Sequence, residues 1–186
     1  MRMVAKVFMR PIVPEPALLL VDVARLVVFP SFMAFAASSD LVTMTISNRL
    51  SLGLAVGFLA LAVATGMGLP EIGFHFAAGF LVLAMAFACY SRGWIGGGDA
   101  KLAAATALWL GFDHLYDYLL CASLFGGVLT LAIIRFRQLP LPKSMADKEW
   151  VQRLHQVDMG VPYGIALALA ALVIYPSTKW MNLTGL

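Results

Sequence analysis

Long apolar stretches, each close to the length that crosses a bilayer, constrain this chain more than any other feature. A helix needs about 20 apolar residues to cross roughly 30 Å of hydrocarbon. Since 61% of the 186 residues are hydrophobic and only 12% are charged, a soluble domain could not bury so much apolar surface. The sequence therefore predicts an all-α, polytopic membrane protein with about six transmembrane helices. The candidate spans are Leu18–Ala37, Leu50–Leu69, Ile72–Tyr90, Asp99–Phe112, Tyr116–Ile134 and Val161–Tyr175.

No internal repeat or low-complexity segment divides the chain, so residues 1–186 are expected to form a single membrane-embedded domain. Residues 1–16, which are basic and contain three prolines, are expected to be an interfacial N-terminal tail. Residues 135–160 form the one sizeable polar loop. Within it Trp150 and Leu154 are four residues apart, which predicts a short amphipathic helix on the membrane surface.

The basic residues indicate an orientation rather than a nucleic-acid partner, because Lys and Arg in membrane proteins mark cytoplasmic loops. Eight of them fall on the side of residues 135–160 and five on the other, which favours a cytoplasmic loop and external termini. The basic N-terminal tail argues for the reverse. Cys89 and Cys121 are too few for a disulfide or zinc framework. We expect no metal and no cofactor. An exposed loop explains Asp113, His114 and Asp117 better than a metal site does.

Two acidic residues, Asp40 and Asp99, are predicted to lie at the same membrane face. Asp40 follows the first apolar span, and Asp99 opens the fourth, which enters from the side where the first one leaves. Two carboxylates about 3 Å apart share one proton and titrate as a coupled pair. The ionised member can activate water, and the protonated member can polarise a peptide carbonyl. We expect the pair to hold one proton near neutral pH.

The three glycines before Asp99 have several interpretations. Gly96, Gly97 and Gly98 would let a substrate backbone pass close to Asp99 and would permit backbone angles that other residues avoid. Asp99 would then lie in the first turn of a helix, whose dipole favours the ionised form. It could instead be only an N-cap. The segment Asp99–Phe112 has 14 residues, or about 21 Å of helix, which would place Asp99 below the membrane surface.

The sequence resembles the prepilin peptidases, membrane aspartic proteases that process type IV pilins, and most of all the short form that serves Flp/Tad pili. The resemblance rests on the GxGD motif at Gly96–Asp99 followed by Ala100-Lys101-Leu102, on AASSDL around Asp40 with Asn48 eight positions later, and on VPYGIALALAAL near the end. It covers most of the chain from about Ser31. One departure is that Ser47 stands where the family often has proline, which bears on the geometry of that turn.

The resemblance implies that Asp40 and Asp99 are the catalytic pair of an aspartic endopeptidase in the bacterial inner membrane. They would face the cytoplasm and remove the leader of an Flp-type prepilin. Gly96–Gly98, Lys101 and Asn48 would support the site. Lys101 could extend to lipid headgroups or hold an acidic group of the pilin, and Asn48 could cap the second helix or orient a turn near Asp40. Larger relatives carry paired CxxC motifs that are associated with N-methylation. This chain has none, so methyl transfer should be absent or supplied elsewhere.

Two other functions remain open from the sequence. GxGD proteases that cut within transmembrane helices often have Tyr-Asp at the first acid, and Ser39-Asp40 here disfavours that branch. A transporter or channel could use the same acids to handle protons or cations, because intramembrane acids are functional by default but not necessarily catalytic. Nothing in the sequence specifies the oligomeric state or the particular pilin.

Overall fold

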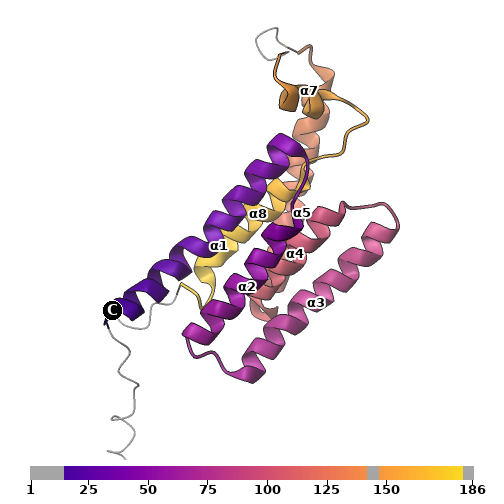
Figure 1. Ribbon diagram of the computed structural model, residues 1–186. Coiled ribbons are helices and arrows are strands. Elements are labelled where there is room, and N and C mark those ends of the chain that lie inside the picture. Colours follow the sequence, from indigo (N-terminus) through magenta and orange to yellow (C-terminus); the bar gives the residue numbers. More distant parts are fainter. Residues whose placement is uncertain (1–14, 142–146, 182–186) are drawn as a thin grey trace, which may run out of the picture.

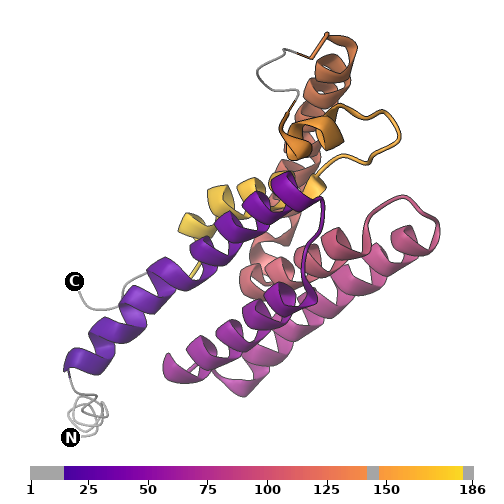
Figure 2. The ribbon, with the colours of Figure 1, turned by 45° about the horizontal axis from the view of Figure 1, so that its top comes forward.

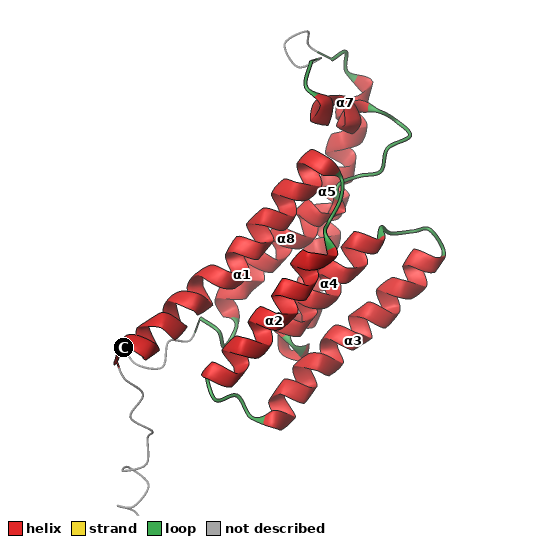
Figure 3. Cartoon of the chain, in the orientation of Figure 1, coloured by secondary structure: helices red, strands yellow, loops and turns green. Residues whose placement is uncertain are grey.

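The computed structural model describes residues 15–141 and 147–181, which fold into helices joined by short connections (Figure 1). Within these residues there are helices and loops but no strand (Figure 3). The predicted all-α class is confirmed. Most of the expected N-terminal tail, and residues 142–146 of the expected loop, lie outside the described residues. The helices are α1 (Glu15–Thr43), α2 (Asn48–Ala64), α3 (Leu69–Ser91), α4 (Gly97–Leu110), η1 (Phe112–His114), α5 (Leu115–Gln138), α7 (Glu149–His155), α8 (Tyr163–Ile174) and η2 (Tyr175–Ser177).

The expected number of about six membrane crossings is not confirmed. Among the described residues, three segments are long and apolar enough to cross a membrane: Leu19–Thr43, Leu69–Ser91 and Phe112–Gln138. The segments Asn48–Ala64 and Tyr163–Ser177 are apolar but shorter. Helix α4 has only 14 residues, or about 21 Å, which is less than the roughly 30 Å of hydrocarbon.

Helix α4 lies at the centre of the bundle because its small side chains let other helices approach closely. It packs against α3, α2 and α8, and Ala100 and Leu102–Leu110 are buried. Gly79 of α3 lies so close to α4 that a Cβ there would be 3.2 Å from the Ala104 carbonyl oxygen. Small residues serve the same purpose wherever helices meet in membranes. Figure 2 shows α2, α3 and α4 together on one side of α1 and α8.

An aromatic cluster holds the C-terminal end of α4. The Trp109 indole N–H donates to the Leu54 carbonyl oxygen at 2.9 Å, and the Trp180 indole N–H donates to the Trp109 carbonyl oxygen at 2.8 Å. The rings of Phe29 and Phe58 pack against Trp109, with centroids 5.1 and 6.0 Å away. In an apolar environment an unpaired N–H is costly, so these bonds let two tryptophans be buried. The cluster secures the end of α4 that lies away from Asp99.

The end of α1 and the buried face of α7 differ from the sequence expectations. Helix α1 continues past Ala37 to Thr43, so Asp40 lies in its last turns rather than beyond the span. The expected amphipathic helix exists as α7, which packs against the ends of α5 and α1. Its buried residues, however, are Val151 and Leu154, and Trp150 is exposed.

Candidate active site

Asp40 is buried at the end of α1, where its carboxylate caps another helix. Only 4% of the residue is exposed. Its Oδ2 accepts a hydrogen bond from the backbone N–H of Gly164, in the first turn of α8, at 2.7 Å. The N-cap residue of α8 is Pro162, which provides no capping side chain. The carboxylate of Asp40 therefore satisfies a helix N-terminus that local sequence leaves open, and the α8 dipole favours a negative charge there.

Gly164 is the residue that lets Asp40 approach α8. A Cβ at this position would lie 2.8 Å from Asp40 Oδ2 and 2.6 Å from Ile46 Cδ1. Both distances are below ordinary contact. Only glycine fits at this position without displacing a neighbour.

Asp99 lies in the first turn of α4 and is half-buried. Gly96 is the N-cap residue, so the interpretation of Asp99 as the N-cap is wrong, whereas its expected place in the first turn is confirmed. The carboxylate turns back towards Gly96: its Oδ2 lies so close that a Cβ on Gly96 would be only 2.9 Å away. An acidic residue at this position interacts favourably with the unpaired N–H groups and the dipole of the helix.

The connection between α1 and α2 joins the two acids. Ile46 packs its side-chain tip against Gly164 beside Asp40, and its Cβ against Gly98, next to Asp99. The carboxyl group of Asp99 is within electrostatic range of Asp40. The structure thus brings the two carboxylates to the same end of the bundle, as the alternation of the spans predicts.

A left-handed residue ends α1 just after Asp40. Met44 has φ 55°, and its N–H donates to the Asp40 carbonyl oxygen at 2.9 Å. The Ser39 hydroxyl donates to the Thr45 carbonyl oxygen at 3.0 Å, which closes the turn. Left-handed residues commonly end helices in this way, although positive φ is uncommon outside glycine. This turn directs Ile46 back between the two acidic helix ends.

The glycines before Asp99 serve close packing within the protein. None of Gly96, Gly97 and Gly98 has a positive φ, so the expectation of unusual backbone angles is wrong. The expected passage of a substrate backbone close to Asp99 stays a prediction. A Cβ on Gly98 would lie 3.1 Å from Ile46 Cβ, and one on Gly97 would lie 3.3 Å from the Tyr90 ring. Side chains of the same chain therefore lie directly beside Gly97 and Gly98.

Lys101 and Asn48 contact each other. The Lys101 ammonium group donates to Asn48 Oδ1 at 2.7 Å, and both side chains are exposed. Asn48 does not cap α2, because the N-cap is Ser47, whose hydroxyl accepts from the Arg49 N–H at 3.2 Å. Ser47, which stands where the resembled family often has proline, therefore starts the helix with a side-chain cap. No Asp or Glu among the described residues lies within 4 Å of Lys101.

Comparison with protein-family models identifies the family of the chain that carries this arrangement. Residues 27–131, more than half of the chain, match the model described as the type IV leader peptidase family. The chain belongs to the type IV leader peptidase family. No curated protein and no solved structure gives a match. Both Asp40 and Asp99 lie in the matched range, whereas Gly164 and α8 lie beyond it.

As a member of this family, the protein is a peptidase built from apolar helices that suit a membrane. In the described part of the chain, no group of three or more His, Cys, Asp or Glu side chains is placed to hold a metal ion. Asp113 and Asp117 are exposed, and Asp113 lies 4.0 Å from the Lys179 ammonium group. Cys89 and Cys121 are free.

Three residues of this candidate site are not identified as site residues by the sequence analysis. Gly164 lies in the quoted VPYG segment, and a glycine directly after Pro-Tyr at the start of an apolar span is a signal that could have indicated close packing. Ile46 carries no sequence signal, because an isoleucine in a short connection is common. Tyr118 of α5 is fully buried near Thr106 and within electrostatic range of Asp99, but an aromatic residue in an apolar span is equally unremarkable.

Proposed function

We propose that this leader peptidase is an aspartic endopeptidase that removes the leader of type IV prepilins of the Flp class. The observation that carries the proposal is the meeting of Asp40 and Asp99. They come from helices far apart in the sequence and lie around one residue, Ile46, at a common end of the bundle. Membership of the family provides the peptidase activity, and the paired carboxylates provide a mechanism for it.

In the proposed mechanism the two carboxyl groups share one proton. The ionised group takes a proton from a water molecule as the water attacks the peptide carbonyl, and the protonated group donates to the carbonyl oxygen. Each acid lies at the N-terminus of a helix, Asp40 at α8 and Asp99 at α4, so the charge of the pair faces two positive helix ends. This chemistry requires no metal, no cofactor and no covalent intermediate.

The surrounding residues fit support roles in the proposal. Gly96 leaves room for the Asp99 carboxyl group, Gly97 for the Tyr90 ring and Gly98 for Ile46. The Lys101–Asn48 hydrogen bond links the first turns of α4 and α2 beside the site. We place the whole chain in one membrane-embedded domain of the bacterial inner membrane, with the acids facing the cytoplasm. That is the side where a basic leader meets the hydrophobic helix of a prepilin.

The test is leader removal from a small Flp-like prepilin that is co-expressed with the protein, followed by the mobility shift on a gel. Asp40→Asn and Asp99→Asn are each expected to lower the cleavage rate by about 10²–10⁴-fold, the usual contribution of a general acid or base. Asp117→Asn is the matched control, because Asp117 is also acidic and also lies in the first turn of a helix. It should cleave at the wild-type rate.

The pH profile adds a second readout. For purified protein, the rate should be bell-shaped in pH, because the pair is inactive both when it holds two protons and when it holds none. Wild-type cleavage by either Asn variant would contradict the dyad. A prepilin that stays uncleaved with the wild-type protein, while another substrate is cut, would contradict the substrate class.

A further inference from the structure

An apolar groove runs along the outer face of the bundle, and neither Asp40 nor Asp99 lines it. Its volume is about 360 Å³. Helices α2 and α3 form its walls and α4 forms its floor, since both outer helices pack against α4. The side chains at its rim are open to the surroundings, for example Phe80, which is 73% exposed, and Leu52, which is 65% exposed. The groove is therefore accessible from the lipid side of the protein.

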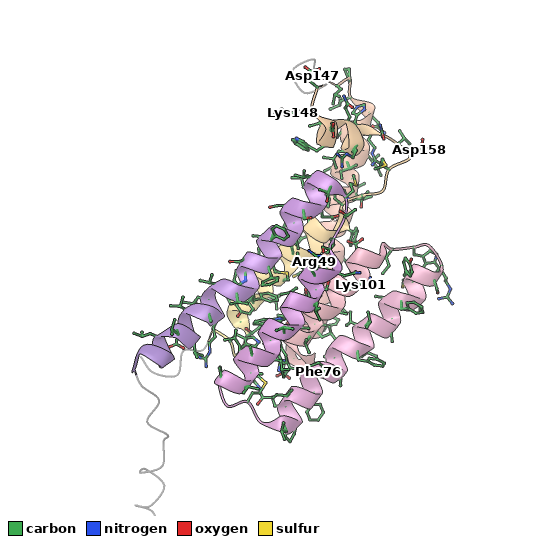
Figure 4. The ribbon with its side chains drawn as sticks, in the orientation of Figure 1. Arg49, Phe76, Lys101, Asp147, Lys148 and Asp158 are labelled. Atoms are coloured by element: carbon green, nitrogen blue, oxygen red, sulfur yellow. The ribbon has the colours of Figure 1, made fainter. Side chains whose placement is uncertain are left out.

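One end of this groove is polar and positively charged. Lys101 lines it, with its ammonium group held by Asn48 Oδ1 and with no carboxylate within 4 Å among the described residues. Ser51 also lines it, and its hydroxyl oxygen is buried without a hydrogen-bond partner in the described structure. Arg49, the residue after Asn48, is exposed near the same end (Figure 4). A buried hydroxyl and an unneutralised ammonium group are donors that suit an anion.

The length of the groove matches part of one leaflet. The residues of α4 that line the groove run from Lys101 to Leu108, a separation of seven residues or about 10 Å along the helix. Half of the bilayer hydrocarbon is about 15 Å thick. Phe76, which also lines the groove, lies well away from Lys101 (Figure 4), so the apolar part extends away from the charged end.

The volume distinguishes an acyl chain from a helix. One turn of helix with its side chains, about 10–12 Å wide and 5.4 Å long, fills about 420–610 Å³. The groove of about 360 Å³ holds less than one such turn. Its volume suits a single hydrocarbon chain, and its charged end is where the phosphate of that lipid would be.

We propose that the groove between α2 and α3 binds a phospholipid, with its phosphate at Lys101 and Ser51 and one acyl chain along α4. The charge of Lys101 and Arg49 favours an anionic headgroup. This site does not depend on the proposed peptidase mechanism, because neither carboxylate lines it.

The experiment is native mass spectrometry of the full chain, purified in detergent and titrated with phosphatidylglycerol. Lys101→Gln is expected to weaken binding about fivefold, which corresponds to one cationic contact of about 1 kcal/mol. Ala55→Phe, which fills the groove, should abolish it. The matched controls are Lys148→Gln in the polar segment before α7 and Ala84→Phe on the exposed face of α3 outside the groove, and both should bind like wild type.

A photoreactive benzoylphenylalanine in place of Leu83 identifies the occupant, because Leu83 lines the groove. Crosslinks to phospholipid support the proposal, and crosslinks to a co-expressed prepilin would overturn it. Equal binding by wild type and Ala55→Phe would also overturn it. Asp99→Asn should bind lipid normally, so an experiment that refutes the peptidase proposal and one that refutes the lipid proposal give different results.

Discussion

Replacing Gly164 by alanine tests whether the contact between α8 and Asp40 positions a catalytic carboxylate. The added Cβ would lie 2.8 Å from Asp40 Oδ2, so the oxygen must retreat by about 0.6 Å to reach an ordinary contact of 3.4 Å. Along the line of the present 2.7 Å hydrogen bond, such a movement lengthens the bond to about 3.3 Å, beyond the usual 3.2 Å limit. Since a 1 Å misplacement can cost about 10²-fold in rate, we expect prepilin cleavage to slow by about ten- to a hundredfold.

The stability of this variant should fall only modestly. Alanine in a helix is favoured over glycine by about 0.5–1 kcal/mol, and a hydrogen bond to a charged group is worth about 1.5–3 kcal/mol. The net loss is therefore about 0.5–2.5 kcal/mol, measured by thermal unfolding in detergent. Gly127→Ala is the control, because nothing lies within 4 Å of a Cβ at that position of α5.

A second substitution separates the two contacts of the new methyl group. The Cβ at position 164 would also lie 2.6 Å from Ile46 Cδ1, and Ile46→Val removes that carbon. If the movement of Asp40 causes the defect, Gly164→Ala combined with Ile46→Val should remain slow. Full recovery in the double variant would assign the defect to Ile46. Wild-type cleavage by Gly164→Ala alone would refute the positioning of Asp40 by α8.

Two further predictions concern the end of the bundle away from the acids. Trp109→Phe should lower the free energy of unfolding by about 1–3 kcal/mol, because it removes a buried hydrogen bond and part of a packed ring. The folded variant should still cleave prepilin. A thermal melt unchanged from wild type would contradict this prediction. Lys179→Gln should cost less than about 1 kcal/mol, because the hydrogen bond from Lys179 to Glu71 is exposed and screened by solvent. That bond raises the pKa of Lys179, so its contribution is complete below the unfolded value of about 10.4 and is lost only as the pH rises through the higher folded value. The melting temperatures of wild type and Lys179→Gln should therefore differ at neutral pH and converge in strong alkali, and a difference that disappears on acidification from pH 9 to 6 would contradict the assignment.

The sequence predicts the helices better than it predicts the membrane crossings. Apolar length alone places the spans close to the observed helices, because a lipid-facing helix must be apolar along its length. It does not show which helices are enclosed by others. Helix α4 is apolar because it packs inside the bundle, and its 14 residues therefore need not match the bilayer. The same composition serves burial in protein and burial in lipid.

The candidate site shows a similar division. The sequence motif places Asp99 at the start of a helix, since glycines followed by an acid and an apolar run form a local signal. The local pattern was misleading for Asn48 and for the three glycines. Asn48 has the right type for an N-cap, yet Ser47 takes that position and Asn48 instead accepts from Lys101, 53 residues away. Gly97 and Gly98 lie against Tyr90 and Ile46, which no spacing rule connects to them.

By itself, the sequence determined that this protein is helical and suited to a membrane, and that Asp40 and Asp99 belong to the same end of the bundle. Those properties follow from composition and from the alternating direction of successive spans. Only the tertiary structure decided how Asp40 is held. Its partner, the Gly164 N–H, is 124 residues away, and the bond exists because α8 starts without a capping side chain of its own beside the end of α1. A local pattern specifies which backbone groups a helix leaves unpaired, but the packing of distant helices determines which side chain reaches them.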